Sequence, residues 1–112
     1  MKIGRLGVVK PAASTNTAAY TVPAANTASC SVMVCNIGVY SAKIRLAIVD
    51  GAAEALADED YIEYGVDIQA GGVLERTGLT LSAGETVVAW ADKNTIAVRV
   101  HGYEEDAQWD DI

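Results

Sequence analysis

An alternation of apolar and polar residues with a period of two runs through most of this chain and constrains it to β structure. The segment 43–49 places Ile44, Leu46 and Ile48 on one side, and the segment 95–101 repeats the pattern. A period of two puts successive side chains on opposite faces of a strand. Both segments are therefore predicted to be strands with one face toward a core and the other toward solvent or a neighbour.

Other segments have the same character. Further strands are predicted at 5–9, 18–22, 28–36, 61–68, 73–81 with a bend at Gly78, and 86–91. A type I turn is predicted at 23–26, a tight hairpin turn at 82–84 and a short hairpin loop at 91–94. One or two turns of helix are predicted at 52–57, with Asp50 as the N-cap.

These elements predict an all-β fold. We expect a single antiparallel β-sandwich or jelly roll of about seven to eight short strands, with at most one short helix. A chain of 112 residues is long enough for one core and too short for two. The predicted organisation is a sandwich domain over 1–103, with an N-terminal strand or arm, and an acidic extension over 104–112.

Charge is divided unevenly along the chain. No acidic residue precedes Asp50, so residues 1–49 carry +5 and residues 50–112 carry −12, which together give the net charge of −7. Regions of opposite sign attract each other, either between copies in an assembly or within one subunit whose two charge sets interleave. In the first case the contacts are expected to involve Lys2, Arg5, Lys10, Glu104, Glu105 and Asp106.

Two apolar residues stand in the acidic extension. A solvated acidic tail does not need Trp109 or Ile112, so both are predicted to be anchors that pack on another surface, with the acids meeting cations there. The alternative is a tail in which these two residues are incidental.

The segment 86–91 is apolar on both faces. It is therefore predicted to be either central in a sheet or covered at an interface. In the second case it forms the seam of an oligomer, with Val87 and Ala89 as contacts.

The two cysteines are not expected to bond to each other. Cys30 and Cys35 are five positions apart, which in a strand places them on opposite faces and roughly 16 Å apart at about 3.3 Å per residue. A disulfide requires Cα atoms within about 7 Å. Cys30 is predicted to lie in the core, whereas Cys35 is free to reach another subunit, which makes an intersubunit disulfide a hypothesis.

Signals for chemistry are weak. The isoelectric point of 4.4 argues against nucleic-acid binding, and no run of apolar residues is long enough for a signal peptide or a membrane span. His101 is the one histidine and is predicted to be an exposed polar residue on the last strand, so zinc or a catalytic triad is not expected. The acidic run 58–60 is predicted to be a solvated loop and not a calcium site. We expect no catalytic residue, no metal and no cofactor, and hence no enzyme.

Several motifs carry a resemblance to a known family. They are Tyr20-Thr-Val-Pro-Ala24, Val34-Cys-Asn-Ile-Gly38, Lys43-Ile-Arg-Leu-Ala-Ile48, Tyr61-Ile-Glu-Tyr64, Gly71-Gly-Val-Leu-Glu-Arg-Thr-Gly-Leu79, Leu81-Ser-Ala-Gly-Glu85 and Val98-Arg-Val-His-Gly-Tyr-Glu-Glu105. With them the chain resembles small β-sandwich virion proteins of tailed bacteriophages. That group includes capsid decoration (cement) proteins and head, neck or tail-fibre accessory proteins. The chain departs from the pattern at Ala25, where a glycine often stands, and in the acidic extension.

The resemblance implies a structural virion protein, made in the host cytoplasm. It implies a decoration protein that binds the major capsid protein as a trimer or other homo-oligomer, without catalytic or ligand-binding residues. The first alternative is a neck, collar or tail-fibre component. A second is an adhesive module for a host glycan, against which stands the scatter along the sequence of Trp90 and the tyrosines at 20, 40, 61, 64 and 103.

Overall fold

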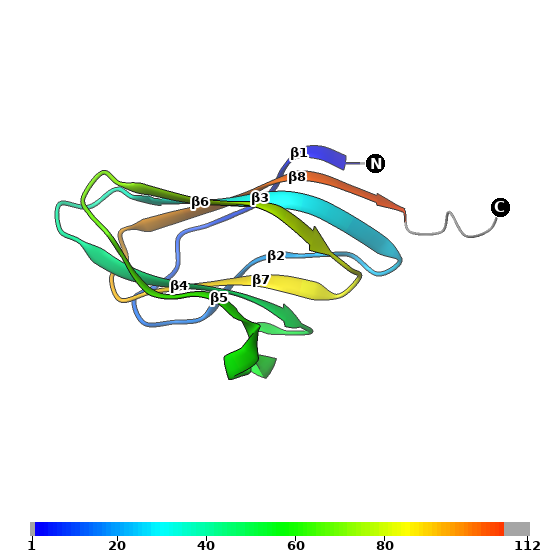
Figure 1. Ribbon diagram of the computed structural model, residues 1–112, viewed down its shortest axis with the longest axis horizontal. Coiled ribbons are helices and arrows are strands. Elements are labelled where there is room, and N and C mark those ends of the chain that lie inside the picture. The colour runs from blue at the N-terminus through cyan, green and yellow to red at the C-terminus, as the bar shows by residue number, and fades with distance from the viewer. Residues whose placement is uncertain (1, 107–112) are drawn as a thin grey trace.

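The computed structural model describes residues 2–106, which form two four-stranded antiparallel sheets packed face to face (Figure 1). The strands are β1 (Lys2–Val9), β2 (Thr17–Thr21), β3 (Asn26–Asn36), β4 (Ala42–Asp50), β5 (Tyr61–Ile68), β6 (Val73–Leu81), β7 (Glu85–Ala91) and β8 (Ile96–Asp106). Sheet A has the order β1-β8-β3-β6 and sheet B the order β2-β7-β4-β5. The predicted all-β sandwich is confirmed.

The strand order is that of a jelly roll. The first strand pairs with the last, the second with the seventh, the third with the sixth and the fourth with the fifth, as in a long hairpin rolled up into two layers. Of consecutive strands, β4 and β5 alone are neighbours within a sheet among the described residues. The connections at 82–84 and 91–94 are therefore not the hairpins that were predicted, because each one joins a strand of one sheet to a strand of the other.

The structure confirms one predicted bend and corrects the type of one predicted turn. The register between β3 and β6 shifts next to Gly78, whose φ is +73°, so the bend expected there is confirmed. At 23–26 the Asn26 N–H donates to the Pro23 carbonyl at 3.2 Å, but Ala25 has a φ of +67°. A positive φ at the third position is the mark of a type II turn, so the predicted type I turn is wrong.

The core lies between the two sheets and follows the predicted alternation. Along β3 the even-numbered residues from Ala28 to Asn36 are buried and the odd-numbered ones are half-buried on the outer face of sheet A. Cys30 is buried, Cys35 is half-buried on the other face, and both thiols are free, so their predicted placement is confirmed. The largest fully buried side chains are Ile44, Leu46, Leu81, Ile96, Val22, Val32, Val34, Val49, Val87, Val88, Val98 and Val100.

A short segment of the chain covers part of the outer face of sheet B. The predicted helix at 52–57 is instead a single 3-10 turn, η1 (Ala53–Ala55), which Ala52 rather than Asp50 precedes. A second 3-10 turn, η2 (Asp58–Asp60), covers the acidic run that was predicted to be a loop. Ala53 and Leu56 pack against a small cluster of Ala47, Val49 and Val88. This cover explains why the segment 86–91 is apolar on both faces.

The last strand is longer than predicted. β8 continues through Glu104, Glu105 and Asp106, which pair in register with Ala28, Thr27 and Asn26 of β3. The sheet therefore extends three residues past the boundary expected at 103. In residues 2–106 there is no helix of the length and apolar character that a membrane crossing requires.

Candidate assembly surfaces

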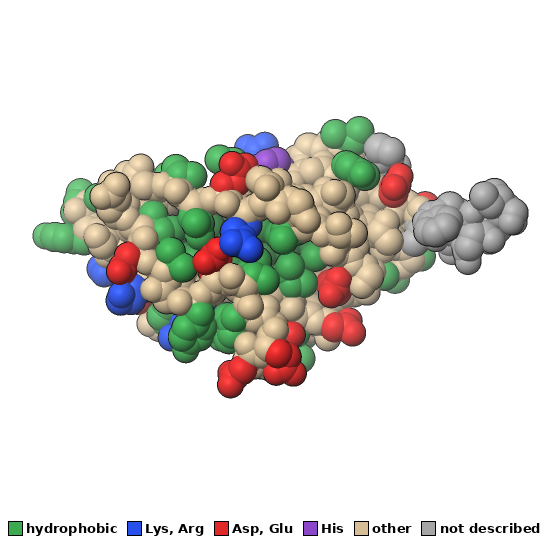
Figure 2. All heavy atoms as spheres, viewed as in Figure 1, with side chains coloured by type: hydrophobic (Ala, Val, Ile, Leu, Met, Phe, Trp, Pro, Cys, Tyr) green, Lys and Arg blue, Asp and Glu red, His purple; other side chains and the backbone are tan. Residues whose placement is uncertain are grey.

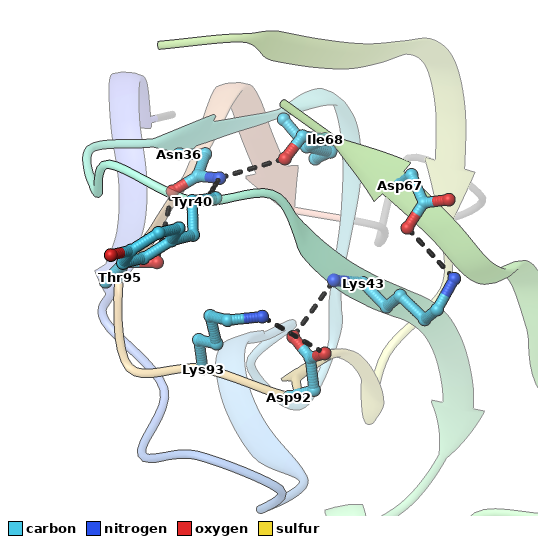
Figure 3. Close-up of polar contacts among 8 residues, drawn as sticks. All are labelled: Asn36, Tyr40, Lys43, Asp67, Ile68, Asp92, Lys93 and Thr95. Atoms are coloured by element: carbon cyan, nitrogen blue, oxygen red, sulfur yellow. Dashed lines mark hydrogen bonds and ion pairs between the residues drawn. The ribbon is translucent and has the colours of Figure 1, made fainter. Parts of the chain in front are cut away.

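A buried asparagine organises one end of the sandwich, which we call the Asn36 end. The Asn36 side chain is fully buried, and its Nδ2 donates to the carbonyls of Tyr40 at 2.8 Å and Ile68 at 2.9 Å. Its Oδ1 accepts from the Gly38 N–H at 3.0 Å. The same oxygen accepts from the Thr95 hydroxyl, also at 3.0 Å (Figure 3). All hydrogen-bonding capacity of the amide that the geometry allows is thus used, and one side chain joins three connecting segments.

The loop held by Asn36 exposes large apolar side chains. Ile37, Val39 and Tyr40 are 62%, 81% and 72% exposed, and hydrophobic side chains project at the left end of Figure 2, where the β3–β4 loop lies in Figure 1. Single exposed apolar residues are ordinary on protein surfaces, but three within four positions of one loop form a patch. The sequence reasoning missed this patch. The signal for it was Asn36 itself, a polar residue in phase with the inward-facing Val32 and Val34.

Ion pairs and hydrogen bonds flank the same end. The Lys43 Nζ lies 2.9 Å from an Asp67 carboxylate oxygen, and the Lys43 N–H donates to Asp92 Oδ1 at 2.9 Å (Figure 3). Lys93 lies 3.6 Å from Asp92. All three contacts are exposed, and exposed pairs add little stability. These contacts help to position the segments that connect the strands at this end, next to the exposed apolar loop.

The outer face of sheet A is uncovered and combines apolar and cationic side chains. Register places Val8, Arg99, Met33 and Glu75 in one row across the four strands. Cys35 shares the next row with Ala97 and Val73. A hollow of about 510 Å³ opens here over β1, β8 and β3, lined by Val8, Val9, Lys10, Met33, Cys35, Ala97, Val98, Arg99 and His101. His101 is half-buried and not exposed as predicted, and its Nδ1 is buried without a hydrogen-bond partner.

The outer face of sheet B gathers aromatic residues around an arginine. Register sets Trp90, Arg45 and Tyr64 in one row across β7, β4 and β5. The Arg45 guanidinium carbon lies 3.9 Å from the centre of the Trp90 ring and 4.4 Å from that of Tyr64. Tyr61 meets Tyr64 edge to face at 4.9 Å. Three of the aromatics that are scattered in the sequence are therefore together in space, and Arg45 Nε is buried without a hydrogen bond.

The opposite end, which we call the Tyr20 end, holds a buried acid. Glu104 is only 6% exposed, and its Oε2 accepts from Asn26 Nδ2 at 3.0 Å. The buried Tyr20 hydroxyl interacts with this carboxylate closely enough to shift its pKa, but it makes no hydrogen bond of standard geometry. Burial, and secondarily the neighbouring Glu104 charge, raise the pKa of Tyr20 to about 12. Glu104 therefore supports the sandwich from within, and its expected role as a contact to another copy is wrong.

The predicted seam is also wrong. Val87 is 0% and Ala89 is 2% exposed, and both belong to the core between the sheets. On the outer side of the same strand Val88 is covered by η1. A side chain that is already buried within the subunit offers no surface to a neighbour, so the strand is apolar on both faces because its own chain encloses it.

The remaining predicted contact residues are divided between the described surface and the chain beyond it. Lys2, Arg5, Lys10, Glu105 and Asp106 are exposed, and Trp109 and Ile112 lie outside the described residues. Within residues 2–106, two ion pairs join distant segments, Lys43 with Asp67 and Arg76 with Glu63 at 2.8 Å. Arg5 and Lys10 make none in this part of the chain, so both remain available to a partner.

The described residues contain no group of three or more His, Cys, Asp or Glu side chains arranged to hold a metal ion. Burial raises the pKa of the Cys30 thiol, which keeps it protonated and unreactive. No family model, no curated protein and no solved structure matches this chain.

Proposed function

We propose that this protein is a structural component of a bacteriophage virion that decorates the capsid, many copies binding the lattice of the major capsid protein. The observation that carries the proposal is the apolar loop at the Asn36 end, together with the resemblance of the sequence motifs to virion β-sandwich proteins. Fully burying an apolar side chain contributes about 1.5–3 kcal/mol. A patch such as Ile37, Val39 and Tyr40, fixed in place by Asn36, is suited to docking against a preformed surface.

Assembly into a coat follows from multivalency. One loop buries too little area for a stable complex on its own. Subunits linked to one another as a trimer or other oligomer bind the lattice through several loops at once, so that weak single contacts add up to persistent occupancy. In this reading the protein has no substrate, and the fold serves to present surfaces.

The direct test is co-sedimentation with phage particles that lack the protein. Wild-type protein is expected to pellet with the particles at saturable stoichiometry. The variant Val39→Asp, which places a charge in the patch, should lower the apparent affinity at least ten-fold. Ala83→Asp, at an exposed turn position of the opposite end, is the matched control and should bind normally. Wild-type protein that stays in the supernatant would overturn the proposed function, and normal binding by Val39→Asp would overturn the role of the loop.

A neck, collar or tail-fibre component is the alternative within the same class. The two differ in copy number, because a lattice protein follows the number of capsid subunits and a neck protein follows the symmetry of a single ring. Quantitative gel analysis of purified particles separates them.

One observation favours a second function, binding of a host glycan. Sugar sites combine aromatic faces with polar groups, and Tyr61, Tyr64 and Trp90 surround Arg45 on the outer face of sheet B. In that case a glycan array should give a signal that Tyr64→Ala abolishes and Tyr103→Ala, an exposed tyrosine of sheet A, preserves. An array without signal removes this candidate.

A further inference from the structure

The hollow on the outer face of sheet A is an uncovered, mainly apolar depression beside two cations, Lys10 and Arg99. Its floor and walls include Met33, Cys35, Ala97 and Val8. Its volume of about 510 Å³ is in the range of sites that take a large side chain or a small ligand, about 300–1,000 Å³. Its composition therefore calls for an occupant that is mainly apolar.

Charge restricts that occupant further. Lys10 and Arg99 line the hollow, and no acid does so among the described residues. Arg5 lies in the neighbouring row, opposite His101, and Glu75 is the one acid in the Met33 row. The His101 Nδ1 at this site is buried and lacks a hydrogen-bond partner. An apolar group that is accompanied by carboxylates fits this surface.

The segment Ala107–Ile112 has that chemistry. It carries Trp109 and Ile112 beside Asp110 and Asp111, and it follows directly on the last strand. We propose that residues 107–112 of one copy dock on the outer face of sheet A of another copy, with the Trp109 indole in the hollow and the two aspartates near Lys10 and Arg99. The inference rests on the proposed assembly function and names the surface through which copies join.

The segment after Asp106 is too short for Trp109 to reach the hollow of its own subunit, so the proposed contact has to form between copies. β8 ends at Asp106, and Arg99 lies seven residues back along the strand, which is about 23 Å at about 3.3 Å per residue. Trp109 is three residues beyond Asp106, and three residues span at most about 11 Å. The Trp109 of the same subunit therefore cannot place its ring over Met33 and Ala97. Figure 1 shows the same separation, since the last strand ends at the right and the strand ends that flank the hollow lie toward the left.

The other outer face is a poorer match for an acidic segment. Asp58, Glu59 and Asp60 lie next to the aromatic cluster of sheet B, and acidic side chains gather at the lower edge of Figure 2 around η1 and η2. Like charges in proximity disfavour association. Sheet B does carry a cation, Arg45, but its guanidinium is already enclosed between Trp90 and Tyr64. On sheet A, by contrast, Lys10 and Arg99 line the hollow without an acid among its lining residues.

The experiment is sedimentation velocity over a concentration series with the full chain. Trp109→Ala removes the docking group and keeps the receptor surface, whereas Arg99→Glu does the reverse. Each is expected to weaken self-association at least ten-fold. Lys93→Glu makes the same charge change at the turn between β7 and β8 and is the matched control. Thermal unfolding shows whether each variant is folded, and Arg99 is an exposed residue on the outer face of sheet A.

Mixing Trp109→Ala with Arg99→Glu tests directly whether the segment of one copy docks on the surface of another. The intact tail of Arg99→Glu can dock on the intact surface of Trp109→Ala, so an equimolar mixture should form a dimer that neither variant forms alone. Self-association that survives Trp109→Ala, a mixture that stays monomeric, or a wild-type chain that is monomeric throughout would overturn the inference. The proposed function is decided separately by co-sedimentation with particles, so the two can fail independently.

Discussion

At the Asn36 end a buried amide makes four hydrogen bonds, whereas at the Tyr20 end a buried hydroxyl makes none and lies beside a buried carboxylate. The two ends belong to the same sandwich, and each one buries polar side chains between the two sheets. A buried polar group stabilises a fold when its partners are present and costs free energy when they are missing. The Asn36 end is thus fixed by one amide whose partners are all present. At the Tyr20 end the Glu104 carboxylate is paired with Asn26, whereas the Tyr20 hydroxyl lacks a partner of standard geometry.

This difference matches what each end presents outward. The Asn36 end holds the exposed apolar loop of residues 37–40, for which a fixed conformation reduces the entropy lost on docking. β8 ends at Asp106 beside Asn26, at the Tyr20 end, and the segment that we propose to dock on another copy follows Asp106 in the sequence. Under the two proposals, the loop of residues 37–40 docks on the capsid lattice, and the segment that follows Asp106 in the sequence docks on another copy.

Asn36→Asp is expected to destabilise the protein most. A carboxylate has nearly the same shape but cannot donate to the carbonyls of Tyr40 and Ile68, and it buries a charge. The expected loss in the free energy of unfolding is about 3–5 kcal/mol, measured by urea denaturation. Asn94→Asp, at an exposed position of the adjacent turn, should change it little. A loss below about 1 kcal/mol for Asn36→Asp would contradict the assigned role.

Alkaline titration tests the Tyr20 end. A tyrosine in the unfolded chain ionises near pH 10, whereas burial raises the pKa of Tyr20 to about 12 in the fold. The unfolded state therefore releases its proton first, and stability is lost as the pH rises from about 10 toward about 12, by about 2–3 kcal/mol. Other groups titrate in this range as well, so the measured quantity is the difference between wild type and Tyr20→Phe.

That difference should favour Tyr20→Phe progressively above pH 10, and Tyr103→Phe, which lacks the buried setting, should behave as wild type. At neutral pH Tyr20→Phe should cost much less than Asn36→Asp, because the hydroxyl meets the Glu104 carboxylate only outside standard hydrogen-bond geometry. Parallel pH profiles for wild type and Tyr20→Phe would contradict the assignment.

Thr95→Val removes one hydrogen bond from the Asn36 end. The Asn36 Oδ1 then keeps the Gly38 N–H as a donor and loses only the Thr95 hydroxyl. The expected cost is about 0.5–1.5 kcal/mol, well below that of Asn36→Asp. In the Asn36→Asp background the same change should have a different effect, because residues that share one network are not additive. Equal effects in both backgrounds would show that the two side chains act independently.

Much of this fold was predictable from the sequence, but the sheet order was not. The period of two located the strands because alternate burial needs only local pattern, as in β3. The pairing of β1 with β8 depends on contacts between chain ends, and the turns at 82–84 and 91–94 read as hairpins because a tight turn is compatible with either kind of connection.

The candidate surfaces were also not predictable from local sequence pattern, because they depend on which strands pair. Arg45, Trp90 and Tyr64 come from three strands and meet only through the register of sheet B, so their spacing in sequence does not indicate a cluster. Glu104 was expected outside the fold because acidic residues are seldom buried, and the partner that makes its burial possible, Asn26, lies far away in the sequence.

The smallest expected effect comes from the turn at the Tyr20 end. Ala25 has a φ of +67°, a conformation that costs an L-residue roughly 1–2 kcal/mol and glycine almost nothing. Ala25→Gly relieves this strain but adds freedom to the unfolded chain, so the expected net gain is only about 0.5–1 kcal/mol. Urea denaturation should show a higher midpoint with an unchanged slope, and Ala24→Gly, one position earlier in the same turn, should lower it. If Ala25→Gly instead destabilised the protein, the positive φ at this position would not be the strained element, and the turn would have to be held by contacts of the methyl group.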